Sequence, residues 1–222
     1  MDGSQFLTVT ETAEALGVTP RHARRLADSG ALTRIARGII DRESVDRYLV
    51  SQRQSRTRSW SEPTAWGAAA LLSGGAPDWM GNTQTSRLRH SLRDISSADE
   101  LITRMRGRSR VQTFDAHRAA LPRLRGLIAM SDQHQLGLSG ISGDVADGYI
   151  DGNQIREIVR GLGLRPAVHG NVTLRAVTFD VGRVQSLVTT RVVAALDAAV
   201  SIDPRTRGVG EQALEEILEV LA

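Results

Sequence analysis

The chain has 222 residues, which is enough for one or two domains with a buried core. Apolar residues make up 41% and charged residues 24%, as in ordinary globular proteins, and no apolar run approaches the ~18 residues of a membrane helix. The chain has no cysteine, which excludes disulfides, thiolate catalysis and cysteine zinc sites. The start, MDGSQFLTVT, lacks the basic and apolar parts of a signal peptide, so we expect a cytoplasmic protein without membrane contact.

The net charge of +3 conceals an uneven distribution, and all 28 basic residues are arginine. Residues 1–60 carry 10 arginines against 7 acids, and residues 87–125 carry 10 against 4. Residues 126–222 carry 8 against 12. Opposite charge in separate regions indicates two different partners.

Two short helices are predicted near the N-terminus. Thr8 and Glu11 form a capping-box pattern at the start of the first helix, and Gly17 ends it. Thr19 is a cap for the second helix, with Pro20 in its first position. The helical periodicity predicts that the solvent-facing side of the second helix carries Arg21, His22, Arg24, Arg25 and Asp28.

Helix, tight turn and helix form a helix-turn-helix, in which the start of the second helix reaches the bases of DNA. A hairpin around residues 36–38 and a closing helix capped by Asp41, with Val45 and Leu49 inward, are predicted to follow. Arginine suits guanine edges and phosphates alike. The predicted DNA-binding residues are Thr19, Arg21, His22, Arg24, Arg25, Arg34 and Arg37.

The segment LTVTETAEALGVTPRHARRLADSGAL, with IIDRESVDRYL after it, resembles the winged helix-turn-helix of excisionase and MerR-like DNA-binding families. The resemblance covers about residues 6–50. The alternative for this segment is a small helical domain with a solvated basic face.

Two further groups of arginines are candidates for a secondary contact with nucleic acid or a partner. The polar linker contributes Arg53, Arg56 and Arg58, and the densest basic run contributes Arg104, Arg106, Arg108 and Arg110. A soluble linker and a solvated helix end are the alternatives.

The rest of the chain is predicted to be mostly helical, with strands in the middle. Helices are expected over residues 63–75, 86–95, 97–111, 189–200 and 208–222, with Trp66 and Trp79 in the core. Residues 146–180 are expected to form a strand, a helix capped by Asp151 and an alternating, half-buried strand. Glu211, Glu215, Glu216 and Glu219 are predicted on the outer surface of the last helix.

Residues 62–222 resemble the C-terminal domain of AbiEi-type antitoxins, which belong to type IV-like toxin–antitoxin pairs. The resemblance is strongest over residues 145–218. The matching elements are DGYIDGNQIREIVRGLGLRP, GNVTLRAV, VVAALDAAV and the DPRTRGVGEQALEEIL turn and helix. The resemblance implies a cognate nucleotidyltransferase-type toxin and repression of the pair's own promoter.

No catalytic motif is present, and the five histidines are scattered singly. Asp144, Asp147 and Asp151 lie close in sequence and are a weak candidate for Mg²⁺, but a polar loop is the simpler interpretation. We therefore expect no catalytic residue, metal or cofactor.

The predicted fold is α+β: a winged helix-turn-helix domain over residues 1–52, a basic linker over 53–62, and a larger, mostly helical α/β domain over 63–222. The predicted function is an antitoxin and autorepressor that binds double-stranded operator DNA, with a homodimer on the DNA left open. The alternatives are a DNA-binding regulator or excisionase-like factor without a toxin, and an enzyme acting on nucleic acid through the aspartate cluster.

Overall fold

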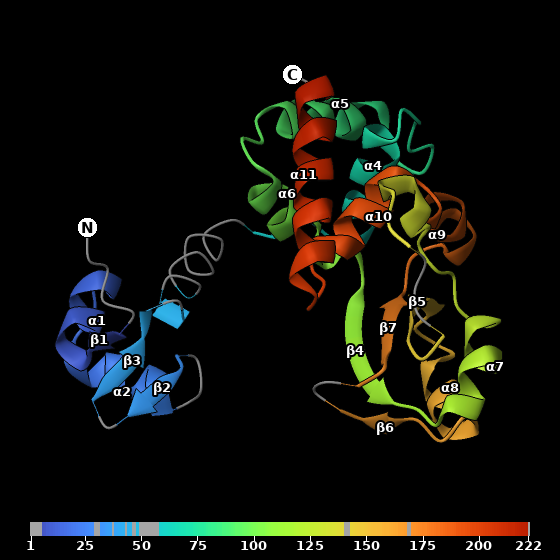
Figure 1. Ribbon diagram of the computed structural model, residues 1–222. Coiled ribbons are helices and arrows are strands. Elements are labelled where there is room, and N and C mark those ends of the chain that lie inside the picture. Colours follow the sequence, from blue (N-terminus) through green and yellow to red (C-terminus); the bar gives the residue numbers. More distant parts are fainter. Residues whose placement is uncertain are drawn as a thin grey trace. The chain divides into compact units, whose positions relative to one another are not determined.

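The computed structural model describes residues 6–28, 32–36, 38–42, 44–45, 48, 58–139, 143–167 and 170–221. The chain divides into two compact units, Met1–Arg58 and Ser59–Ala222 (Figure 1). Helices and strands are mixed in both, which confirms the predicted α+β class.

The N-terminal unit combines a helical pair with a small sheet. Its elements are β1 (Phe6–Thr8), α1 (Val9–Leu16), α2 (Pro20–Asp28), β2 (Arg34–Ala36) and β3 (Ile39–Asp41). The antiparallel sheet has the order β1-β3-β2, so the predicted hairpin of β2 and β3 gains a third strand. The strand β1 was not predicted.

Local capping residues set the ends of the two helices as predicted. The Oγ1 atom of Thr8 accepts a hydrogen bond from the Glu11 N–H at 3.2 Å, and Glu11 Oε2 accepts from the Thr8 N–H at 2.7 Å. Gly17 ends α1 with φ of 63°, a left-handed conformation that favours glycine. Thr19 Oγ1 accepts from the His22 N–H at 3.3 Å at the start of α2.

A small apolar core joins these elements. It consists of buried Leu7, Leu32, Ile40 and Val45, with Val9, Leu16, Leu26, Ala27 and Tyr48 packed against them. Asp41 Oδ2 accepts from the Ser44 N–H at 2.9 Å, as expected for the cap of the closing helix. Arg42, Ser44, Val45 and Tyr48 are helical, whereas Leu49 lies outside the described residues.

The C-terminal unit is larger. Its α-helices are α4 (Glu62–Leu72), α5 (Asn82–Arg93), α6 (Ala98–Met105), α7 (Leu121–Arg125), α8 (Ile155–Gly161), α9 (Val181–Val188), α10 (Arg191–Ala198) and α11 (Pro204–Leu221). Its 3₁₀ helices are η1 (Arg106–Arg108), η2 (Arg118–Ala120) and η3 (Gln133–Leu136). Its strands are β4 (Arg110–Asp115), β5 (Ala146–Asp151), β6 (Arg165–Pro166) and β7 (Val172–Val177).

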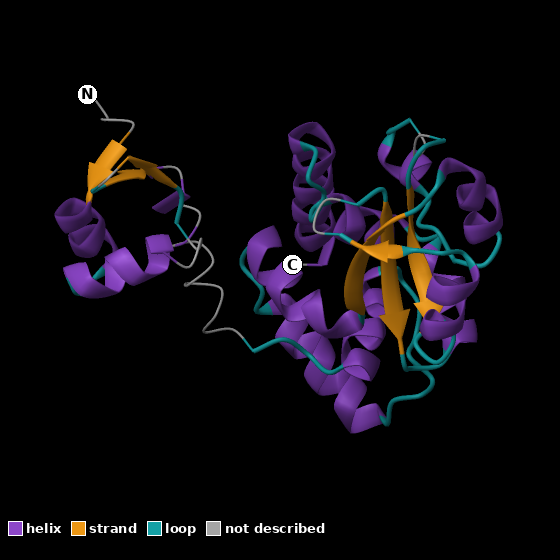
Figure 2. Cartoon of the chain, turned by 90° about the horizontal axis from the view of Figure 1, so that it is seen from below, coloured by secondary structure: helices purple, strands orange, loops and turns teal. Residues whose placement is uncertain are grey.

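These strands form one sheet with the order β5-β7-β4-β6, in which β5 and β7 are parallel and the other neighbours antiparallel. Helices lie on both sides of the sheet (Figure 2). The larger core includes Trp66, Leu101 and Leu196, and the smaller includes Phe114, Leu121 and Leu174. Trp79 is half-buried against the larger core, so both tryptophans pack as predicted.

Three local predictions for this unit were wrong. The strand β7 is central in the sheet, so even Arg175 is buried, and the expected alternation is lost because both faces are covered. Asp151 does not cap α8; its carboxylate accepts from the Asn153 N–H at 2.8 Å within a turn. The helix predicted to run to residue 111 ends at Met105, and Arg110 begins β4.

Candidate nucleic-acid interface

The second helix of the N-terminal unit has one buried face and one cationic face. Ala23 is fully buried, and Leu26 and Ala27 pack against the core of the unit. Successive residues of an α-helix turn by about 100°, so the side chains of Arg21 and Arg25 leave the helix opposite Ala23. The exposed residues of α2 are Pro20, Arg21, Arg24, Arg25 and Asp28, with His22 half-exposed.

Two of the candidate arginines are already engaged within the unit. Arg25 Nη2 lies 3.0 Å from His22 Nδ1, one helical turn away. Arg34, on the hairpin, forms an ion pair with Asp28 at the end of α2. These contacts restrict how the two guanidinium groups point.

Arg21 and Arg24 differ from this pair. Neither has a hydrogen-bond or ion-pair partner within the described part of the chain. Both are exposed on a helix of the unit, so their guanidinium groups can donate to a phosphate without breaking a contact with a described residue.

Two hydrogen bonds join the hairpin and the residue before it to α1 and to the closing helix. The Val9 N–H donates to the Gly38 carbonyl oxygen at 3.2 Å, and the Thr33 N–H donates to Ser44 Oγ at 3.0 Å. Gly38 has φ of 81°, which explains a glycine at this turn. Arg37 lies outside the described residues, as do the linker residues Arg53 and Arg56, while Arg58 is exposed.

The densest basic run of the sequence does not form a free cationic surface. Arg104 donates to Glu100 Oε1 from Nε at 3.0 Å and from Nη2 at 2.8 Å, and it lies over the Trp60 ring. Arg106 and Arg110 are exposed. Arg108 is only 4% exposed, so its side chain is not on the surface, where the predicted contact with nucleic acid or a partner would require it.

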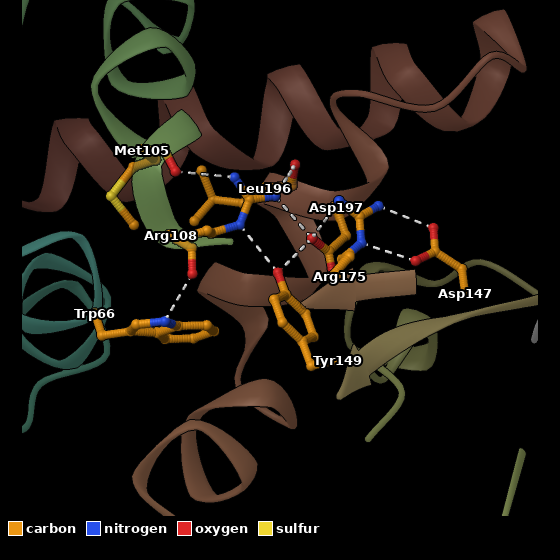
Figure 3. A network of polar contacts seen from close by, with 8 residues as sticks. All are labelled: Trp66, Met105, Arg108, Asp147, Tyr149, Arg175, Leu196 and Asp197. Atoms are coloured by element: carbon orange, nitrogen blue, oxygen red, sulfur yellow. Dashed lines mark hydrogen bonds and ion pairs between the residues drawn. The ribbon is translucent and has the colours of Figure 1, made fainter. Parts of the chain in front are cut away.

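Arg108 instead belongs to a buried polar network (Figure 3). Its Nε donates to the Tyr149 hydroxyl at 2.9 Å, and its Nη2 donates to Asp197 Oδ1 at 2.8 Å. Its guanidinium group also donates to the carbonyl oxygens of Met105 and Leu196, and its own carbonyl oxygen accepts from Trp66 Nε1 at 2.9 Å. The run therefore contributes one arginine to the core of the fold.

Asp197 also joins this network to the sheet. It accepts from the Tyr149 hydroxyl at 2.7 Å and lies 3.5 Å from Arg175 Nη1. Burial alone would raise the pKa of Asp197, but the charges of Arg175 and Arg108 outweigh it and hold that pKa below its usual value. Burial raises the pKa of Tyr149, so its hydroxyl stays protonated and donates.

The aspartate cluster of the sequence does not come together around a common point. Asp147 accepts two hydrogen bonds from Arg175, at 2.7 and 2.9 Å. Asp144 pairs with Arg118 at 2.8 Å, and Asp151 lies in the turn described above. Among the residues that the structure describes, no group of three or more histidine and carboxylate side chains is arranged to hold a metal ion.

Two of the glutamates on α11 are used within the C-terminal unit. Glu215 Oε1 accepts from the Ala98 N–H at 2.7 Å, at the start of α6. Glu216 forms an ion pair with Arg191.

Within the described residues, no helix is both long and apolar enough to cross a membrane.

Two short helices, of which the second is cationic, and an antiparallel hairpin define the N-terminal unit as a winged helix-turn-helix. Residues 2–39 match the family model described as "Transcriptional regulator, AbiEi antitoxin". This match confirms the predicted resemblance to AbiEi antitoxins, and the description of that family is consistent with a DNA-binding regulatory role for the unit. No curated protein and no solved structure matches the chain.

The position of the match differs from the position of the predicted resemblance. The motifs of the N-terminal segment resemble those of excisionases and MerR-like proteins, whereas the motifs that resemble AbiEi antitoxins lie in the C-terminal region. The matched residues span β1, α1, α2, β2 and the first residue of β3. The resemblance of residues 62–222 to the antitoxin domain stays a prediction.

Proposed function

We propose that this chain is an antitoxin that also represses its own promoter. The N-terminal unit binds double-stranded operator DNA through α2, and the C-terminal unit counteracts a cognate toxin of the nucleotidyltransferase class. The observation that carries this proposal is the cationic outer face of α2 in a unit that matches AbiEi transcriptional regulators.

Growth of cells that express the neighbouring gene, with and without this chain, tests the antitoxin part. We expect the neighbouring product to arrest growth and this chain to restore it. A harmless neighbour, or arrest that this chain does not relieve, would contradict the antitoxin role. The second candidate, a DNA-binding regulator without a toxin partner, would then stand, and the restriction of the family match to residues 2–39 favours it.

Double substitution Arg21→Ala/Arg24→Ala tests the phosphate contacts. If each arginine neutralises one phosphate, the slope of log affinity against log salt becomes shallower by about 0.9 per contact, or roughly two units in total. Affinity should fall by a similar factor on operator and random duplexes, because phosphates carry no sequence information. Binding of the full chain to both duplexes across a salt series measures this.

Arg156→Ala/Arg160→Ala is the matched control, because it removes two exposed arginines from α8 of the other unit. It should leave the salt slope of the wild-type chain unchanged. An equal change in both double variants would show that total charge, and not the face of α2, determines binding.

A further inference from the structure

The arginines of α2 fall into two groups, and the difference indicates different roles on DNA. Arg21 and Arg24 have no partner among the described residues, whereas Arg25 is bonded to His22. A phosphate accepts hydrogen bonds over a wide range of directions. A base edge does not, because a guanidinium must meet two acceptors of guanine in one plane.

The bond between Arg25 and His22 has one possible direction. A guanidinium group can only donate, so His22 Nδ1 is the acceptor and the proton of the neutral ring is on Nε2. His22 is half-buried, so its side chain has less freedom than that of a fully exposed residue. His22 therefore offers an acceptor at 3.0 Å to the long side chain of Arg25.

This contact leaves Arg25 able to read a base. A guanidinium carries five N–H donors, and the bond to His22 uses one, so a two-bonded fork is still available. Holding the side chain in one orientation before binding lowers the conformational entropy lost when the fork forms.

We propose that His22 is a positioning residue that orients Arg25 to read one base pair, while Arg21 and Arg24 contact phosphates. This inference rests on the proposed operator binding and adds the residue that determines base choice. The outward direction of Arg25, opposite the buried Ala23, is compatible with entry into the major groove.

The experiment starts with selection of duplexes from a randomised pool by the full wild-type chain. Enrichment of no sequence would contradict operator binding itself. With an enriched sequence in hand, repeating the selection with Arg25→Ala identifies the base pair whose preference is lost. The ratio of affinities for the operator and for a duplex changed at that base pair is then the quantity measured.

We expect Arg25→Ala to reduce this ratio by about 10- to 100-fold, as for one bidentate contact. His22→Leu, which lacks an acceptor, should reduce it by about three- to tenfold, as for one hydrogen bond. His22→Asn, whose side-chain oxygen can replace Nδ1 as acceptor, should restore it to within about twofold.

A double-mutant cycle separates positioning from a general structural effect. If His22 acts through Arg25, His22→Leu has no further effect on the ratio in the Arg25→Ala background. A loss of the same size in both backgrounds, or an unchanged base preference in His22→Leu, would overturn the inference while leaving operator binding intact.

Discussion

Replacement of Asp197 by alanine is expected to destabilise the C-terminal unit by about 3–5 kcal/mol, because it leaves buried cations without their shared counter-charge. Arg108 and Arg175 are both 4% exposed, and Asp197 contacts both guanidinium groups. In the variant Arg175 keeps Asp147, but Arg108 keeps only neutral partners. A cost of this size is a large share of the roughly 5–15 kcal/mol that stabilises a typical domain.

Urea unfolding of the full chain, followed by tryptophan fluorescence, measures this effect. All three tryptophans, Trp60, Trp66 and Trp79, lie in the C-terminal unit, so the signal reports on that unit alone. Tyr149→Phe provides a milder variant that keeps the ion pairs and removes one hydroxyl, with an expected loss of about 1–3 kcal/mol.

The control is Glu216→Ala, which breaks an exposed carboxylate–arginine pair on α11. Since exposed ion pairs contribute little, the expected loss is below about 1 kcal/mol. Similar losses for Glu216→Ala and Asp197→Ala would show that burial of the network does not determine its energetic role.

The parts of the fold that were predictable from the sequence are those determined by neighbouring residues. The capping box of Thr8 and Glu11, the left-handed Gly17 and the cap at Thr19 each act over three residues or fewer from the helix end that they define. Such signals can be recognised without knowledge of the tertiary structure. The two helices and the hairpin of the N-terminal unit were predictable for this reason.

The features that were missed depend on contacts between distant parts of the chain. Arg108 looks like its neighbours in a basic run, and its partner Asp197 lies 89 residues further along. Similarly, Glu215 looks like a solvated glutamate, although it accepts from the Ala98 N–H, 117 residues away. Residue type and spacing predict that a side chain is charged, but only the fold determines whether its counter-charge comes from the protein or from a partner.

The same distinction applies to the candidate site. The outward set of arginines on α2 followed from helical periodicity and was present in the sequence. The bond between His22 and Arg25 was not predicted, although the two residues are three apart on a helix and therefore able to meet. The pairing of Arg34 with Asp28 depends on the hairpin packing beside α2, so the sequence did not indicate it.

Gly210→Ala is expected to destabilise the C-terminal unit by about 1–3 kcal/mol, because α11 packs against the backbone of α10 at this residue. A Cβ atom at Gly210 would lie 2.3 Å from the Ala199 nitrogen and 2.8 Å from the Ala195 carbonyl oxygen. Backbone atoms cannot rotate away as a flexible side chain does, so the two helices must separate. Urea unfolding followed by tryptophan fluorescence measures the loss.

Gly208→Ala is the matched control on the same helix, two residues earlier. Gly208 is exposed, and a Cβ atom there would meet nothing within 4 Å. Alanine is favoured over glycine inside a helix by roughly 0.5–1 kcal/mol, so this variant should be more stable than the wild type. Opposite signs for the same substitution would locate the close contact of α10 and α11 at Gly210, whereas stabilisation by both variants would contradict it.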